Sequence, residues 1–151
     1  MEEALRWAGK ARAQGEVPVG AVLSDTRGRI LAAAHNQVEG PGQCAAGHAE
    51  MLAMAEGARR LGQSRLVGCT LTVTLEPCAM CAAAIGHFRI QKLVFGAYDS
   101  KGGAVTHGPR LYARGGSLHR PGEIIGGVQE RRCGALMRDF FQQVRSSPTS
   151  G

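Results

Sequence analysis

The chain has no long hydrophobic run. Among its 151 residues no window approaches the ~18 consecutive apolar residues of a membrane-spanning helix, so we expect no membrane partner. It also has no basic segment ahead of an apolar one at its start, because it opens with the acidic stretch Met-Glu-Glu, whereas a secretory signal begins with positive charge. These two absences predict a cytoplasmic protein.

An even set of cysteines is also absent. The chain has five cysteines, and an odd number leaves one unpaired in a disulfide framework. Cytoplasmic thiols are in addition kept reduced. We therefore do not expect a disulfide-stapled scaffold, and 151 residues are enough to bury a core without one. The five are Cys44, Cys69, Cys78, Cys81 and Cys133.

No linker or internal repeat divides the sequence. Hydrophobic residues make up 44% of the chain and charged residues 20%, which are ordinary values for a globular domain. We expect one domain over residues 1–145. The last six residues, 146–151, read SSPTSG and are expected to form a disordered tail.

Negative charge is scarce relative to positive charge. The chain has 18 Lys and Arg residues against 12 Asp and Glu, a formal net charge of +6, and a pI near 9.5. Such an excess favours an anionic partner, with nucleic acid ahead of a membrane surface. The alternative is a basic surface that only aids solubility.

Hydrophobic periodicity divides the chain into alternating helices and strands. We expect helices over residues 1–14, 49–61, 78–87 and 131–144, and strands over 17–23, 29–35, 70–75, 92–97 and 124–128. This alternation predicts a layered α/β domain with a mixed sheet. The glycine-rich segment 37–47 has the composition of a loop that leads to His48, whereas residues 100–122 show no clear pattern.

The stretch LEPCAMC places Cys78 and Cys81 three residues apart behind Pro77, at the expected start of a helix. Three interpretations are open. The pair could be a thioredoxin-like redox couple, since a helix N-terminus lowers a thiol pKa. It could be half of a zinc site, or the two residues could be buried thiols that happen to be neighbours.

His48 and Glu50 favour zinc. Two cysteines and a distant histidine give three ligands and leave the fourth tetrahedral position open, as a catalytic zinc site requires. Glu50, two residues after His48, can reach a water molecule at that position. His-x-Glu followed by Pro-Cys-x-x-Cys is the signature of zinc-dependent nucleobase deaminases.

This residue set predicts a hydrolytic deamination. Zinc lowers the pKa of its bound water, and the resulting hydroxide attacks the ring carbon that carries the amino group. Glu50 carries the proton from the water to the ring nitrogen and to the departing ammonia. The overall reaction exchanges NH₂ for oxygen.

The sequence resembles the bacterial tRNA adenosine deaminases of the cytidine-deaminase-like superfamily over about residues 1–145. The motifs that carry the resemblance are EVPVGAV at 16–22, HAE at 48–50, VTLEPCAMCA at 73–82, FGAYD at 95–99 and DFF at 139–141. The resemblance implies a three-layer α/β fold with a five-stranded mixed sheet between helices, one Zn²⁺ per chain, and a homodimer. It further implies conversion of adenosine to inosine at C6 of the wobble base in an arginine tRNA, bound through its anticodon stem-loop.

The resemblance also implies roles for residues near the substrate. Asn36 would hydrogen-bond the target base, and Asp99 with Lys101 would contact the backbone or sugars of the anticodon loop. Phe140 and Phe141 lie where the family places aromatic and basic residues beside the RNA, although either could instead pack against the sheet. Basic side chains can hold RNA phosphates or be plain surface charges, and the candidates are Arg110, Arg114, Arg120, Arg138 and Arg145.

The chain departs from the family pattern close to the substrate. Residues 44–47 read CAAG where the family has Asp-Pro-Thr-Ala, in a loop one residue longer, and Cys44 could reach the metal from there. Leu118-His119 replaces Asn-His, and the paired terminal arginines are missing. Two alternatives therefore stay open, a deaminase of a free nucleobase or nucleoside such as guanine or cytosine, and a zinc-bearing RNA-binding subunit.

Overall fold

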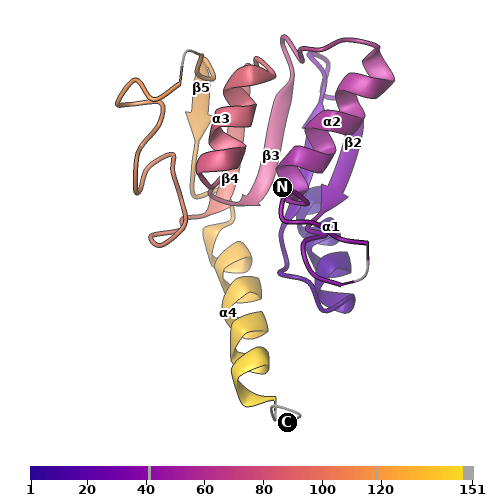
Figure 1. The fold of residues 1–151 in the computed structure, drawn as a ribbon, viewed down its shortest axis with the longest axis vertical. Coiled ribbons are helices and arrows are strands. Elements are labelled where there is room, and N and C mark those ends of the chain that lie inside the picture. The colour runs from indigo at the N-terminus through magenta and orange to yellow at the C-terminus, as the bar shows by residue number, and fades with distance from the viewer. Residues whose placement is uncertain (41, 118, 148–151) are drawn as a thin grey trace.

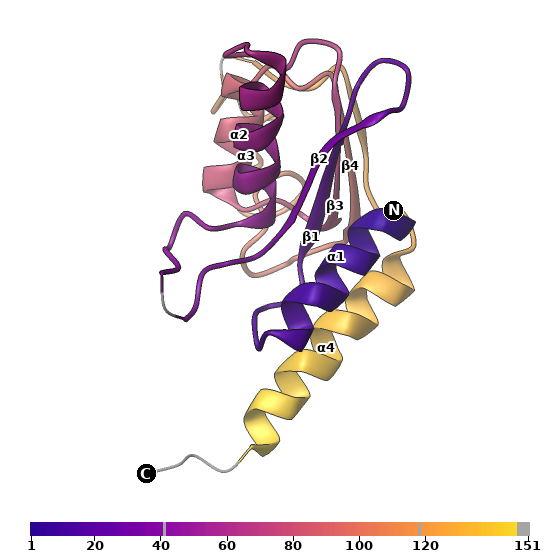
Figure 2. The same cartoon turned by 90° about the vertical axis from the view of Figure 1, so that its right-hand side faces the viewer.

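The computed structural model describes residues 1–40, 42–117 and 119–147, which form three layers (Figures 1 and 2). A sheet of five strands has the order β2-β1-β3-β4-β5. β1 is antiparallel to β2 and β3, whereas β3, β4 and β5 are parallel, so the sheet is mixed as predicted. Helices α2 and α3 cover one face and α1 and α4 the other, and α4 extends beyond the end of the sheet. The strands are β1 (Gly20–Ser24), β2 (Ile30–His35), β3 (Thr70–Leu75), β4 (Lys92–Ala97) and β5 (Glu123–Ile125).

The helices are α1 (Glu2–Ala13), α2 (Ala49–Leu61), α3 (Ala79–His87) and α4 (Glu130–Ser146). Helix α2 ends at Gly62, whose φ of 64° is the left-handed conformation that glycine adopts without strain. The core between the sheet and the helices includes Leu23, Met54, Leu71, Leu93 and Phe95, all fully buried. In the described ranges no helix is both long and apolar enough to cross a membrane.

Several element boundaries differ from the sequence prediction, most of them by one or two residues, and β5 ends at Ile125 and not at residue 128. β1 begins at Gly20 and not at residue 17, because Pro18 lacks an N–H and the strand pairing begins beyond it, where Gly20 N–H donates to Thr74 Oγ1 at 3.1 Å. Helix α4 is longer than expected and includes Ser146, which we had assigned to the tail. Residues 148–151 of that tail lie outside the described residues, so its disorder stays a prediction.

The long segment 98–122 contains no helix or strand in its described residues, yet hydrogen bonds from two of its residues anchor it to the rest of the domain. The buried Tyr112 hydroxyl donates to the carbonyl oxygen of Ala82 on α3 at 2.6 Å. Ala104 N–H donates to Pro77 carbonyl at 2.9 Å. The segment therefore packs beside the start of α3 and forms one wall next to LEPCAMC.

Candidate metal centre and substrate cavity

Two helix N-termini bring three predicted metal ligands together. His48 is the N-cap residue of α2, Cys78 is the N-cap residue of α3, and Cys81 lies in the first turn of α3. Both helices cover the same face of the sheet and begin at neighbouring points (Figure 1). One ligand atom from each of the three residues lies within 4.8 Å of the others.

The spacing of these atoms fits a zinc ion. His48 Nδ1 lies 3.6 Å from Cys78 Sγ and 3.4 Å from Cys81 Sγ. Tetrahedral zinc with Zn–S bonds of about 2.3 Å and Zn–N bonds of about 2.05 Å would separate sulfur from nitrogen by ~3.6 Å. The three side chains can thus hold zinc with little rearrangement and leave a fourth position for another ligand.

The two thiols differ in their proton affinity. The Cys81 thiol hydrogen-bonds Cys78, which lowers the pKa of Cys78 to about 5. That same interaction and burial raise the pKa of Cys81 well above its ordinary value. A metal ion that binds both sulfurs as thiolates must displace any proton that they carry.

Glu50 lies beside this cluster in the first turn of α2 and is only 4% exposed. Burial raises the pKa of its carboxyl group. A raised pKa suits a group that accepts a proton and then returns it near neutral pH. The geometry thus combines a three-ligand metal centre with a proton-transfer group.

A cavity of about 750 Å³ opens over the metal centre. His48, Glu50 and Cys78 lie among its lining residues. The other predicted site residues that line it are Asn36, Asp99, Lys101 and Phe141, together with the candidate cations Arg138 and Arg145. The structure therefore gathers most of the sequence-predicted site around one space.

Asn36 is held in place at the end of β2. Its Oδ1 accepts a hydrogen bond from Ala49 N–H at 2.9 Å, and the residue is only 8% exposed. Within the described residues its NH₂ group has no hydrogen-bond acceptor. This group is therefore available to a molecule in the cavity.

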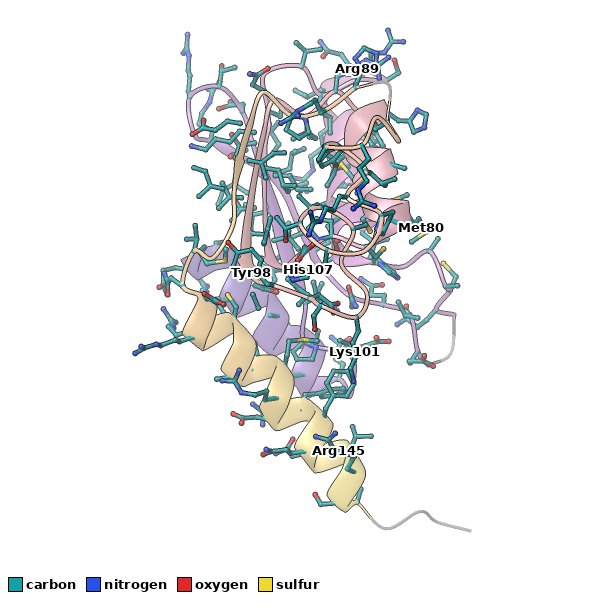
Figure 3. The ribbon with its side chains drawn as sticks, turned by 90° about the vertical axis from the view of Figure 1, so that its left-hand side faces the viewer. Met80, Arg89, Tyr98, Lys101, His107 and Arg145 are labelled. Carbon is teal, nitrogen blue, oxygen red and sulfur yellow. The ribbon has the colours of Figure 1, made fainter. Side chains whose placement is uncertain are left out.

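Asp99 and Lys101 follow β4 and form the rim of the cavity. Asp99 Oδ1 accepts hydrogen bonds from Lys101 N–H at 3.1 Å and from Gly102 N–H at 2.9 Å, so it shapes the turn that carries the Lys101 side chain. In Figure 3, Lys101 lies between Tyr98 and His107 on one side and Arg145, farther along α4, on the other. One side of the cavity is therefore cationic.

The two phenylalanines of α4 have different surroundings. Phe141 is 42% exposed and lines the cavity, whereas Phe140 is 9% exposed and is not among the described lining residues. Their rings meet edge to face with centroids 5.3 Å apart. Phe140 thus packs as a core residue and supports Phe141, which faces the cavity.

Glu76 is an important residue that the sequence analysis did not single out. Its buried carboxylate accepts hydrogen bonds from His107 Nδ1 at 2.8 Å, from Thr106 N–H at 2.9 Å and from Asp99 N–H at 3.1 Å. It also accepts from the N–H groups of Val105 and His107, both at 3.2 Å. Its place in LEPCAMC, directly before two ligands, was the available signal.

The remaining cysteines lie away from the ligand cluster. Cys69 and Cys133 are buried, as expected for core residues, and Cys44 is exposed. The ligand group found among the described residues consists of His48, Cys78 and Cys81 only. Cys44 is thus no member of it.

Comparison with known proteins gives concordant results. Residues 1–97 match the profile of the family described as the cytidine and deoxycytidylate deaminase zinc-binding region. The chain is 46% identical over 145 residues to a tRNA-specific adenosine deaminase of Bacillus subtilis strain 168, covering 96% of this chain and 88% of that protein.

Solved structures show the same fold. One, from a study of A-to-I editing by tRNA:A34 deaminases at the wobble position of transfer RNA, has a TM-score of 0.85 and 41% identity, covering 90% of this chain and 96% of the other. A guanine deaminase from Nitrosomonas europaea has a TM-score of 0.70 and 26% identity, with 92% of this chain and 81% of the other covered. The fold is thus shared by proteins that act on different substrates.

Proposed function

This chain belongs to the tRNA-specific adenosine deaminases, within the family of zinc-binding cytidine and deoxycytidylate deaminases, and from that premise we propose that it converts the wobble adenosine of an arginine tRNA to inosine. The observation that carries the proposal is the pairing of buried Glu50 with the ligand group of His48, Cys78 and Cys81 on the floor of a cavity that has cationic side chains at its rim. The high identity over nearly the whole chain supports the adenosine substrate.

The chemistry follows from the residues around the metal centre. His48, Cys78 and Cys81 would hold a zinc ion, which would supply a Lewis acid that makes water nucleophilic near neutral pH. Glu50 would accept a proton from the attacking water and deliver it to the ring nitrogen beside C6. It would then carry a second proton, from the new hydroxyl group on C6, to the amino group, which leaves as ammonia. Burial of Glu50 keeps this proton transfer away from bulk solvent.

The cavity residues orient the base. Asn36 donates from its NH₂ group to the purine, since its Oδ1 is already bonded to Ala49 N–H. Phe141 offers an exposed ring on which a neighbouring base can stack, and Asp99 and Lys101 contact the sugars or phosphates of the loop. Single-stranded loops suit such a site because their bases can be turned outward without breaking a duplex.

Two further features of the proposal concern the protein in the cell. We propose that it acts as a homodimer and in the cytoplasm, where its tRNA substrate is found.

An assay of substrate choice tests this function. The zinc-loaded protein is incubated with an arginine tRNA anticodon stem-loop that carries adenosine at position 34, and separately with adenosine, guanine, cytosine and cytidine. Products are identified by mass. We expect inosine in the stem-loop and no turnover of the small molecules; turnover of guanine alone would overturn the tRNA substrate and leave a free-base deaminase.

A further inference from the structure

A second cavity lies at the opposite end of α3 from the metal centre. It has a volume of about 370 Å³ and is lined by Arg65, Arg89, Arg120 and His119, with Gln91 and Val67 at its edge. Arg89 comes two residues after the end of α3. Figure 3 shows Arg89 at the end of the molecule opposite to Arg145, with Lys101 between them. This cavity is therefore separate from the deaminase site.

The charges around this cavity are not balanced by neighbouring acids. No carboxylate lines it in the part of the chain that the structure describes, and its arginines form no ion pair with a described Asp or Glu. The C-terminus of a helix carries a partial charge of only about −0.5. One cation would offset that charge, so three arginines leave a net positive cavity.

Arg89 has a backbone conformation that favours glycine. Its φ is 59°, and the position just past the end of a helix is most often glycine because a side chain there costs ~1 kcal/mol. The Arg89 guanidinium is held by one hydrogen bond, from Nη1 to the Gly86 carbonyl oxygen at 2.8 Å. Its remaining N–H groups are available to a ligand. A strained residue whose side chain faces a cavity points to a binding role.

We propose that the cavity formed by Arg65, Arg89 and Arg120 binds a backbone phosphate of the RNA substrate. The inference rests on the proposed function for the identity of the polyanion. Arginine guanidinium groups bind phosphate oxygens through paired N–H donors, and Gln91 adds an amide. Val67, 74% exposed at the edge, offers an apolar contact for a ribose or base.

The position of the cavity fits an extended ligand better than a free anion. Arg65, Gln91, His119 and Arg120 are all exposed, so a ligand reaches them from the protein surface. From Cys81 to Arg89 the chain advances by ~12 Å at 1.5 Å per helical residue. A nucleic-acid strand carries a phosphate every ~3.4 Å of helix axis, so one bound molecule can contact both sites.

Salt-dependent binding of a fluorescently labelled, full-length arginine tRNA transcript tests the proposal. The zinc-loaded protein is compared with Arg89→Gly, Arg120→Gln and the double variant. Arg6→Gln on α1, which removes the same single charge as each single variant, serves as the control. We expect the double variant to bind about tenfold more weakly and to reduce the slope of log affinity against log salt by 1 to 2, since each lost phosphate contact removes about one. Arg6→Gln should behave as wild type.

Two further readouts separate this proposal from its alternatives. Arg89→Gly should melt no lower than Arg120→Gln, because glycine suits the left-handed backbone, and both should deaminate saturating RNA at the wild-type rate. If the double variant and Arg6→Gln have equal salt slopes, the cavity does not bind a phosphate of the RNA. If the transcript is deaminated in that case, the proposed deaminase function still holds. Conversely, a transcript that is bound with the expected slopes but never deaminated would overturn the function and keep the site. If inorganic phosphate raises the melting temperature of wild type but not of Arg89→Gly, while RNA binding is unchanged, the ligand is a free anion and the RNA proposal is wrong.

Discussion

At the scale of single residues, the pKa values of two glutamates near the metal centre are shifted in opposite directions. Burial raises the pKa of Glu50. Burial also acts to raise the pKa of Glu76, but hydrogen bonds from His107 and from the N–H groups of Thr106 and Asp99 outweigh it and hold that pKa below its usual value. Glu50 is therefore suited to proton transfer, whereas Glu76 is a permanent acceptor that organises the chain around it.

Replacing Glu50 by glutamine should abolish turnover and retain the metal. Glutamine keeps the size of the side chain but cannot accept and return a proton, so we expect kcat to fall by at least 10²–10⁴-fold. Zinc content, measured by atomic absorption, should stay at one per chain because the three ligands are unchanged. A variant that deaminates at the wild-type rate would contradict the role of Glu50.

The Glu76→Gln substitution should act on stability and not on chemistry alone. The amide NH₂ would face backbone N–H groups that now donate to a carboxylate oxygen, which leaves buried donors without an acceptor. We expect a loss of about 2 kcal/mol or more in the free energy of unfolding, measured by urea denaturation. Glu123→Gln, whose carboxylate is half exposed and only 3.7 Å from Lys92 Nζ, is the control and should change little. If Glu76→Gln and Glu123→Gln unfold at the same urea concentration, the hydrogen bonds to Glu76 do not stabilise the fold as described.

At the scale of helices and strands, α2, β3 and β4 have the limits that the sequence predicted. The alternation in Thr70–Leu75 and the left-handed Gly62 at the end of α2 are local signals that can be recognised in a single chain. The metal ligands could be predicted for a similar reason, because a zinc site with one open position restricts residue types and spacing strongly. The fifth strand and the mixed sheet were also predicted, whereas the order of the strands in the sheet was not.

The segment 98–122 could not be predicted because non-local hydrogen bonds determine its conformation. Glu76 accepts from N–H groups 23 to 31 residues later in the chain. There is no space for a side chain at Gly103, because an added Cβ would lie 2.5 Å from the Glu76 carboxylate. Neither contact produces a periodic pattern in the sequence. The different surroundings of Phe140 and Phe141 were equally hidden, because adjacent helical residues differ only by the rotation of the helix.

The contact between α1 and β1 gives a prediction for two glycines. An added Cβ at Gly20 would clash with the Ala4 carbonyl oxygen and lie 2.6 Å from Ala8 N, so Gly20→Ala must push α1 away from the sheet. We expect a loss of about 1–3 kcal/mol in the free energy of unfolding. Gly9→Ala meets no atom within 4 Å and lies in the interior of the same helix, so it should stabilise the protein by about 0.5–1 kcal/mol. Urea denaturation of both variants measures the difference, and a fall in stability for Gly9→Ala would contradict the packing described.

At the scale of the whole molecule, the metal centre connects parts of the chain that are distant in sequence. His48 follows the loop after β2, whereas Cys78 and Cys81 begin the helix after β3. A zinc ion bound to all three would join α2 to α3 on one face of the sheet. Around it, cationic side chains lie both at the rim of the deaminase cavity and at the far end of α3, consistent with a net charge of +6 that favours a polyanionic ligand.

Removal of zinc should therefore destabilise the whole domain as well as stop catalysis. With free zinc at a thousandfold excess over its dissociation constant, linkage contributes about 4 kcal/mol, or roughly 10 °C in melting temperature for a domain of this size. Calorimetry before and after treatment with a chelator measures this shift.

Cys78→Ser should melt close to the metal-free protein and respond little to added zinc. Cys44→Ser, at an exposed position, should match wild type with and without zinc. If the chelator changed neither melting nor deamination, the three ligands would not form the metal centre; if Cys44→Ser also lost its response to zinc, the loop before His48 would have to supply a fourth ligand.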